Sequence, residues 1–256
     1  MNQDIEFLRD KKYLTLHDLH NTKSGRCFVV GNGPSLNDLD LSLLKDEDCF
    51  SCNRIYLGYD KWNLDFNFPY WCIEDVRVAR DTVYEWNALE ADIKFLPYEL
   101  AESITNWSNI CLVNQIRGGW KKIGNKLLYW PDFSLSPDRV YHGMTVTYFM
   151  LQVACMMGYN PIYLIGIDHY YSRTDDVREV GMSEGRLISS GDDPDHFTPD
   201  YFGEGRKYHK PRTDLTTNSY RVAQLTAIEN NIEIYNASAK TKLDVFDRVD
   251  YGSLFK

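Results

Sequence analysis

The chain has 256 residues, of which 43% are hydrophobic and 25% are charged, and its formal net charge is −9. This length and composition are typical of a globular protein with a substantial core, and we expect one domain over residues 1–256. The acidic balance argues against nucleic acid as a partner, because no general positive field is present to gather phosphates.

Residues 1–24 form a polar lead-in that contains one short helix. Its first twelve residues are charged and have no apolar core, so the sequence predicts no secretory signal. No apolar run approaches the roughly 20 residues that span a bilayer. We therefore expect a cytoplasmic protein that is at most peripherally associated with the inner face of a membrane. A homo-oligomer is possible for such a protein.

The first strand-like run, Cys27–Val30, enters a turn with two glycines and a proline, and leucines at helical spacing follow. Strand, glycine turn and helix start together make a phosphate-sized anion site, where the first N–H groups of the helix point at the ligand. An ordinary tight turn of an α/β protein has the same pattern. The turn lacks the third glycine of the dinucleotide fingerprint and the Gly-Lys-Ser/Thr of a P-loop. The candidate nucleotide-binding residues here are Gly31, Asn32, Gly33, Pro34 and Ser35.

Further strands are predicted at Asp48–Cys52, Tyr70–Ile73, Ile93–Leu96 and Ile110–Val113, with a helix over Val76–Leu89. The six cysteines fall mostly in such apolar runs, which favours buried free thiols in a reducing compartment. Cys49 and Cys52 have the spacing of a redox or zinc pair, but no second pair completes a zinc site.

The segment Met144–Met157 is apolar nearly all round, so it predicts a centrally packed helix that ends at Gly158. The most apolar strand, Ile162–Ile167, follows it. Residues 171–213 are rich in polar and aromatic side chains and have no sustained period, which is typical of an active-site lid or binding insertion. A helix over Asp214–Asn230 and a strand at Glu233–Tyr235 complete the predicted elements.

Strands that alternate with helices predict βαβ units. We expect a Rossmann-like, doubly wound α/β fold with a mostly parallel sheet and an irregular lid insertion. Ligands of such sheets bind beyond the carboxyl ends of the strands. Several residues follow the strands there. The candidate ligand-binding residues are Asn53, Glu74, Asp75, Gly166, Asp168, His169 and Tyr170. Asn53 could equally be a turn former, and one of the two acids after the third strand could be a helix N-cap.

Two histidines of the insertion, His196 and His209, are candidate general bases, because the free pKa of histidine lies near neutrality. With His196, the carboxylates of Asp192, Asp193 and Asp195 could instead hold a divalent metal, or form a solvated acidic loop. The cations nearest these features in sequence are Arg139, Lys207, Lys210 and Arg212.

Three segments together resemble a known family: residues 29–36, residues 51–54 and residues 162–170. They are similar to the core motifs of the bacterial sialyltransferases of glycosyltransferase family 42. They are equally similar to the related group called domain of unknown function 115, which includes motility accessory factors and hydroxymethylpterin pyrophosphokinase-like proteins. The similarity covers roughly residues 27–53 and 139–170, with a looser match over 192–250.

The resemblance implies roles for individual residues. Asn32, Gly33, Ser35 and Asn53 would hold the CMP part of a CMP-sugar, Asp168 the ribose or cytidine, and Tyr170 the departing phosphate. The Arg-x-Thr-Ser-Gly segment of the family appears as residues 139–143, so Arg139 and Gly143 match, whereas Tyr141 and His142 depart from the pattern. Glu74 and Asp75 replace a family asparagine. The catalytic histidine corresponds to His209 by its distance to the last helix, while His196 lies in a neighbouring motif.

The implied function is an inverting, metal-independent glycosyltransferase that needs no cofactor and uses a sialic-acid-like CMP-sugar donor and a glycan or glycoconjugate acceptor. One alternative is a Mg²⁺-dependent diphosphokinase, in which Asp168, Glu74, Asp75 and the acidic loop would hold the ion. Another is a nucleotide-binding module without catalysis.

Overall fold

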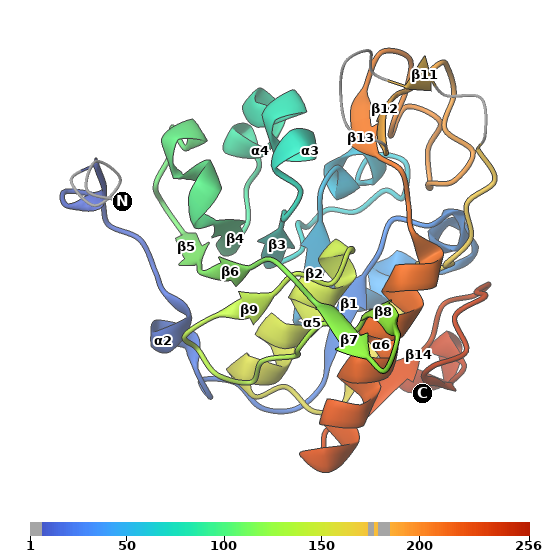
Figure 1. Cartoon of the computed structure of the whole chain (residues 1–256). Helices are drawn as coiled ribbons and strands as arrows, with labels where there is room; N and C mark the ends of the chain where they lie inside the picture. The colour runs from blue at the N-terminus through green and yellow to red at the C-terminus, as the bar shows by residue number, and fades with distance from the viewer. Residues whose placement is uncertain (1–6, 174–176, 179–184) are drawn as a thin grey trace.

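The protein is described here by a computed structural model, which covers residues 7–173, 177–178 and 185–256. Its largest sheet has eight parallel strands in the order β15-β14-β10-β1-β2-β3-β4-β5 (Figure 1). These strands are β1 (Cys27–Val30), β2 (Cys49–Cys52), β3 (Tyr70–Cys72), β4 (Ile93–Pro97), β5 (Ile110–Val113), β10 (Ile162–Ile165), β14 (Ile234–Asn236) and β15 (Asp247–Arg248).

The strand β1 shows why the central strands are continuous apolar runs. Cys27 and Val29 belong to the core on one face of the sheet, whereas Phe28 and Val30 belong to the core on the other face. A parallel sheet is covered on both faces, so both sets of alternating side chains are buried. The predicted doubly wound α/β fold is therefore confirmed. The six cysteines are free and buried, also as predicted.

The two long helices of the described chain, α5 (Val146–Met157) and α6 (Thr213–Glu229), cover one face of this sheet together with the short α2 (Leu16–Leu19), and short helices cover the other. The second face packs against α3 (Val76–Asp81), α4 (Val83–Ala88) and five 3₁₀ helices, η1 (Pro34–Asp38), η2 (Leu41–Leu44), η3 (Ile55–Gly58), η4 (Tyr98–Ser103) and η5 (Tyr251–Phe255). None of the helices in the described ranges is long and apolar enough to cross a membrane.

The structure corrects two helix predictions. The single helix over Val76–Leu89 is broken at Thr82, whose hydroxyl donates to the carbonyl of Val78 and whose backbone (ψ 23°) leaves the helical region. The leucines after the glycine turn lie on two 3₁₀ helices and, for Leu39, between them, instead of on one helix. At the end of α5, Gly158 is left-handed as expected, with φ 102°.

Several short strands were not predicted. The described part of the insertion is irregular over residues 189–206, but β11 (Val177–Arg178), β12 (Arg186–Ile188) and β13 (Lys207–His209) form an antiparallel sheet that was not predicted. Residues 1–6 of the lead-in and residues 174–176 and 179–184 of the insertion lie outside the described residues. Between β5 and α5, β6 (Gln115–Ile116) pairs with β9 (Val140–Tyr141), and β7 (Trp120–Ile123) forms a hairpin with β8 (Lys126–Tyr129).

The strand order reverses direction between β1 and β10. From β1 the chain adds β2 to β5 on one side, and then β10, β14 and β15 on the other. The carboxyl ends of β1 and β10 therefore flank the topological switch point, where open α/β sheets bind their ligands.

Candidate active site

The glycine turn after β1 packs against the end of β10. The N–H of Gly33 donates to the carbonyl of Gly166 at 2.9 Å. A Cβ at Gly33 would lie 2.5 Å from the Asp168 carboxyl carbon, and one at Gly31 would lie 2.4 Å from the Gly166 oxygen. Both glycines are therefore required by the close approach of two parts of the chain itself.

Asp168 binds the start of the helix that follows the turn. One carboxylate oxygen accepts from the Ser35 N–H at 2.9 Å, and the other accepts from the Ser35 hydroxyl. Burial raises the pKa of Asp168, and the two bonds from Ser35 oppose this shift. The sequence predicted that the N–H groups of this turn point at a ligand. Instead, those of Gly31, Gly33, Ser35 and Leu36 are bonded within the protein, and Pro34 has none.

Three carboxamide groups with buried oxygens lie just beyond the strand ends. The amide nitrogen of Asn32 donates to Cys52 Sγ at 3.1 Å, and that of Gln115 donates to Glu74 Oε2 at 3.1 Å. Asn53 has a left-handed backbone (φ 50°) that directs its carbonyl to the Trp71 indole N–H. Among the described residues, no donor reaches the side-chain oxygens of these three carboxamides. Unsatisfied buried acceptors of this kind suit a ligand that carries amino or hydroxyl donors.

Sequence reasoning identified Asn32 and Asn53 but missed Gln115. The signal was present, because Gln115 is a polar residue two positions beyond the predicted strand Ile110–Val113. Its side chain is buried only because β6 continues the chain across the end of β3 and pairs with β9.

Beyond β3, the carboxylate of Glu74 forms a buried contact with the imidazole of His142. Its Oε1 lies 3.2 Å from Nε2 of His142, and only 4% of the Glu74 side chain is exposed. Burial raises the pKa of Glu74, although His142 favours its charged form. Two residues that depart from the family pattern thus contact each other. Gly143 follows, and its small size is required because a Cβ would lie 2.1 Å from the ring of Tyr148.

Asp75 joins the same strand end to the insertion. One of its oxygens caps α3 by accepting from the N–H of Arg77, so the predicted N-cap role is confirmed. The other lies 2.6 Å from Nδ1 of His209 on β13. Burial opposes ionisation of Asp75, but the bonds from His209 and from α3 outweigh it and lower the pKa. Among the described residues, Nε2 of His209 has no hydrogen-bond partner, so it is available to a substrate.

His196 occupies a more enclosed position. Its Nδ1 lies 2.8 Å from Asp193 Oδ2, and its ring stacks on Tyr201 at 3.9 Å. The carboxylate of Asp193 also accepts from the N–H groups of Asp195 and Phe202. These contacts hold the loop together, so His196 has a structural role in addition to its candidate catalytic one.

The acidic loop does not form the metal site that the sequence allowed. Asp195 accepts from the backbone of Ser172 and Arg173, Asp193 is engaged as above, and Asp192 is exposed. In the described ranges, no three His, Cys, Asp or Glu side chains converge in a way that could hold a metal ion. The acids on which the diphosphokinase alternative depends likewise have separate partners, since Asp168 binds Ser35 and Glu74 binds His142.

The remaining candidate residues either have other partners within the protein or are exposed. His169 Nε2 lies 2.8 Å from the Thr217 hydroxyl of α6, and burial lowers the pKa of this histidine. Tyr170 is half exposed, and the Lys242 ammonium lies 3.8 Å from its ring centroid. Arg139 is exposed beside Asp138, which pairs with His17 near α2, so the structure does not bring it to the other candidates. Arg212 pairs with Asp214.

The insertion is fastened over the strand ends. The N–H of Phe197 donates to the Asn32 carbonyl at 3.0 Å, and Phe197 and Tyr201 are buried there. Burial raises the pKa of Tyr201, and a hydrogen bond from the Asn53 side chain opposes this shift. The lid is thus seated directly on two of the candidate donor-binding residues.

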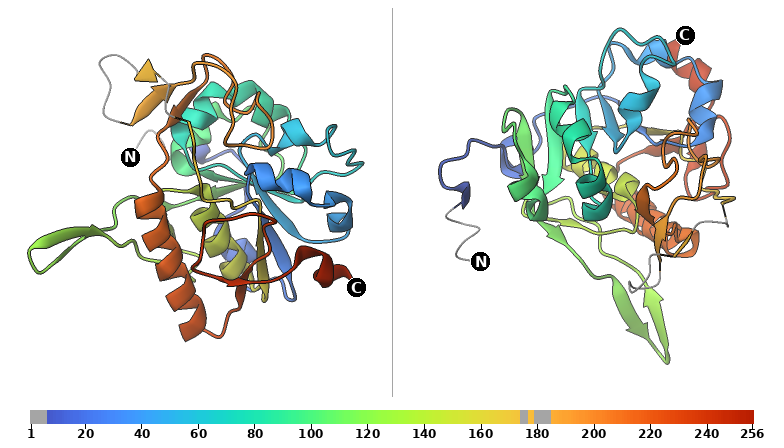
Figure 2. Two further views of the ribbon diagram at one scale, coloured as in Figure 1. Left: turned by 90° about the vertical axis from the view of Figure 1, so that its right-hand side faces the viewer. Right: turned by 90° about the horizontal axis from the view of Figure 1, so that it is seen from above.

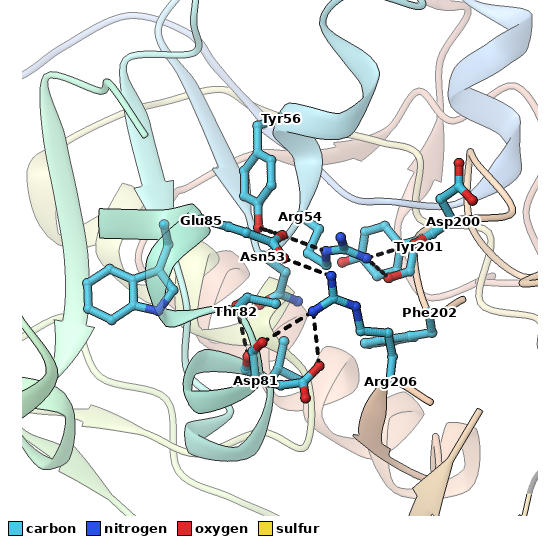
Figure 3. A network of polar contacts seen from close by, with 12 residues as sticks. Asn53, Arg54, Tyr56, Asp81, Thr82, Glu85, Asp200, Tyr201, Phe202 and Arg206 are labelled. Carbon is cyan, nitrogen blue, oxygen red and sulfur yellow. Dashed lines mark hydrogen bonds and ion pairs between the residues drawn. The ribbon is translucent and has the colours of Figure 1, made fainter. Parts of the chain in front are cut away.

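A network of charged groups holds the lid in this position (Figure 3). The guanidinium of Arg54, which is buried, donates to Glu85 at 3.0 Å and to the carbonyls of Asp200 and Tyr201. Glu85 also accepts from Arg206 of the lid at 2.8 Å. Because Arg54 directly follows Asn53, the network couples the lid to the end of β2.

Comparison with solved structures identifies the fold. The chain is similar to the MAf glycosyltransferase from Magnetospirillum magneticum AMB-1 (TM-score 0.55, 14% identity), matching over 98% of this chain and 37% of that one. It is also similar to the sialyltransferase CstII from Campylobacter jejuni in complex with a substrate analogue, CMP-3FNeuAc (TM-score 0.50, 18% identity, 87% and 86% covered). A variant of the sialyltransferase CST-II in complex with CMP gives a TM-score of 0.51 at 17% identity, with 89% and 86% covered.

The chain has the fold of these glycosyltransferases. It spans about a third of the length of the MAf protein and most of the length of the sialyltransferase. No protein-family profile matches the sequence, and no curated protein matches it.

Proposed function

We propose that the protein is a glycosyltransferase that takes a sugar from a CMP-sugar donor and transfers it to a hydroxyl of a glycan or glycoconjugate. The observation that carries the proposal is the set of unsatisfied carboxamide oxygens of Asn32, Asn53 and Gln115, which follow strands β1, β2 and β5 in a fold shared with glycosyltransferases. Cytosine offers an exocyclic amino group, and ribose and sugar offer hydroxyls. These donors match the acceptors that the protein leaves unpaired.

In the proposed reaction, Nε2 of His209 removes the proton from the acceptor hydroxyl. The acceptor oxygen forms a bond to the anomeric carbon while the bond from that carbon to the phosphate oxygen breaks. The electron pair leaves with CMP, and the configuration inverts. Asp75, at 2.6 Å from Nδ1, holds the imidazole in the tautomer that accepts at Nε2 and stabilises the imidazolium that forms.

A CMP donor carries one phosphate, so the reaction needs no divalent ion to chelate a diphosphate. Tyr170 is the side chain proposed to donate a hydrogen bond to the departing phosphate, whose charge grows as the bond breaks. Because Phe197 and Tyr201 cover Asn32 and Asn53, the donor enters when residues 192–206 lift. Closure of the lid afterwards excludes water.

The direct test is ligand binding measured by thermal shift and calorimetry, with CMP, UMP, AMP and ATP, each with Mg²⁺ and with a chelator. We expect CMP alone to raise the melting temperature without Mg²⁺, by roughly 5–10 °C at a hundredfold excess over Kd. Binding of ATP only with Mg²⁺ would instead favour a diphosphokinase, and no affinity for any cytidine nucleotide would overturn the proposal.

A matched pair of variants links this binding to the site. Asn53→Ala should abolish the CMP-dependent shift, because it removes the unpaired carboxamide oxygen. Asn231→Ala is the control, since Asn231 has the same left-handed backbone (φ 57° against 50°) but is exposed and distant in the sequence. Both variants carry the same backbone strain, so a difference between them reports the side chain alone.

A further inference from the structure

The hairpin of β7 and β8 projects from the body of the protein. In both views of Figure 2 it is the green arm that extends away from the sheet and helices. It exposes large apolar side chains, with 50% of Trp120, 64% of Leu127 and 39% of Leu128 accessible. Exposed apolar residues gathered on one projecting element mark an interaction site.

The hairpin is also basic, in contrast to the rest of the chain. From Gln115 to Pro131 the sequence has four cations, Arg117, Lys121, Lys122 and Lys126, and no acid, although the whole chain has a charge of −9. Lys121 pairs with Asp132 at 2.5 Å and Arg117 lies 3.6 Å from Glu99. Lys122 and Lys126 have no acidic partner among the described residues, so their charge is available.

The cross-strand register distributes these residues over both faces of the hairpin. Lys122 is opposite Leu127, and Lys121 is opposite Leu128, one position along. Successive residues of a strand point to opposite faces, so Lys122 and Leu127 share one face, whereas Lys121, Lys126 and Leu128 share the other. Each face therefore carries lysine and leucine. A flat protein partner would cover one face only. A lipid interface surrounds an inserted arm, and it accommodates apolar and cationic groups on both sides.

We propose that this hairpin docks the protein on an anionic membrane surface. Leu127 and Leu128 would enter the boundary between headgroups and acyl chains, and Lys122 and Lys126 would contact anionic headgroups. Trp120, which pairs with Tyr129 nearer the base, would lie at the level of the headgroups. The inference is independent of the proposed reaction, because it uses no residue of the catalytic proposal.

The base of the hairpin is attached to the candidate site. The Tyr129 hydroxyl donates to the carbonyl of His142 at 2.8 Å, and Asn218 of α6 donates to the carbonyl of Tyr129. Strands of four residues at about 3.3 Å per residue place the hairpin tip roughly 10–15 Å from this base. Docking by the tip therefore holds the candidate site near the membrane.

The test is co-sedimentation of the full chain with vesicles of phosphatidylcholine alone and of phosphatidylcholine with about one-third phosphatidylglycerol. We expect binding to the anionic vesicles that weakens as salt is added. Lys122→Gln with Lys126→Gln should weaken it about 30-fold, which corresponds to about 1 kcal/mol per lysine. Leu127→Ser with Leu128→Ser should weaken it on neutral and anionic vesicles alike.

Matched controls carry the same substitutions elsewhere. Leu225→Ser with Ile228→Ser removes two exposed apolar side chains of α6, and Lys45→Gln with Lys240→Gln removes two exposed charges. Both controls should bind as the parent chain does. Equal binding by the hairpin variants and the parent would overturn the proposal, as would a folded parent that binds no anionic vesicle. Hairpin-dependent self-association without lipid, seen by size-exclusion chromatography, would also overturn it and assign the arm to a second copy of the chain.

Discussion

The Glu74 carboxylate and the His142 imidazole, 68 positions apart in the sequence (142 − 74), form a buried pair at 3.2 Å. Each residue alone departs from the pattern of the family that the chain resembles. Together they compensate for each other, because a buried carboxylate needs a partner and His142 supplies it. Gln115 donates the second bond to Glu74, so the pair also fixes a carboxamide of the candidate donor site.

Removal of His142 should therefore destabilise the fold. His142→Ala leaves Glu74 buried with Gln115 as its remaining partner, and we expect a loss of about 3 kcal/mol in the free energy of unfolding, measured by urea denaturation. His17→Ala is the control, because its pair with Asp138 is exposed, and it should change stability by less than about 0.5 kcal/mol. Equal effects of the two variants would show that the Glu74 pair contributes nothing.

The same pair predicts a dependence on pH. The pKa of Glu74 is raised above 4.5, the ordinary value of a glutamate, so the folded protein binds this proton more tightly than the unfolded chain does. The contribution of Glu74 to the free energy of unfolding therefore falls as pH rises from 4.5 through the folded pKa. Above the folded pKa this contribution is constant. Glu74→Gln removes the titration, so the parent should lose stability relative to this variant over that window. A pH-independent difference between the two would contradict the shift.

The glycine turn should not tolerate a side chain at position 33. Gly33→Ala places a Cβ 2.5 Å from the Asp168 carboxyl and so disturbs its bonds to Ser35. We expect a loss of about 1–3 kcal/mol in the free energy of unfolding. At Gly191 the same substitution meets no atom within 4 Å, and it should be close to neutral. Gly33→Ala with parental stability would mean that the turn does not pack against Asp168 in solution.

The lid should be loosened by loss of Glu85. Glu85→Ala leaves the buried guanidinium of Arg54 without its carboxylate and releases Arg206, at a cost of about 3 kcal/mol. Limited proteolysis should then cut within residues 186–206 much faster than in the parent. Asp214→Ala, which breaks the exposed pair with Arg212, is the control and should leave the cleavage rate unchanged. Protection of the lid in Glu85→Ala would rule out the network as its fastening.

Substitutions of His209 and His196 should have different effects on the kinetics. His209→Asn should lower kcat for CMP release about 10²–10⁴-fold with little change in stability, because its imidazole is half exposed. His196→Asn should lower stability and raise KM, because its ring packs on Tyr201 and bonds to Asp193. If neither variant lowers kcat, neither histidine is the base, and binding without turnover in the parent would favour the module without catalysis.

Much of the core could be predicted from the sequence. Strands such as Cys27–Val30 and Ile110–Val113 are apolar on both faces, and this pattern is sufficient to identify buried parallel strands. The break of the helix at Thr82 could not be predicted, because β-branched residues also occur within helices and only the observed bond to Val78 marks the end. β15 was missed because two residues, Asp247 and Arg248, carry no apolar signal.

For the site, the sequence alone determined which polar residues follow the strands, because the carboxyl ends of parallel strands meet at one edge. Only the tertiary structure decided their partners. Ser35 binds Asp168 across 133 positions and Asp75 binds His209 across 134, and no local pattern encodes contacts of that separation. Secondary structure follows from the periodicity of neighbouring side chains, whereas these pairs form only when the sheet and the lid bring distant segments within hydrogen-bond reach.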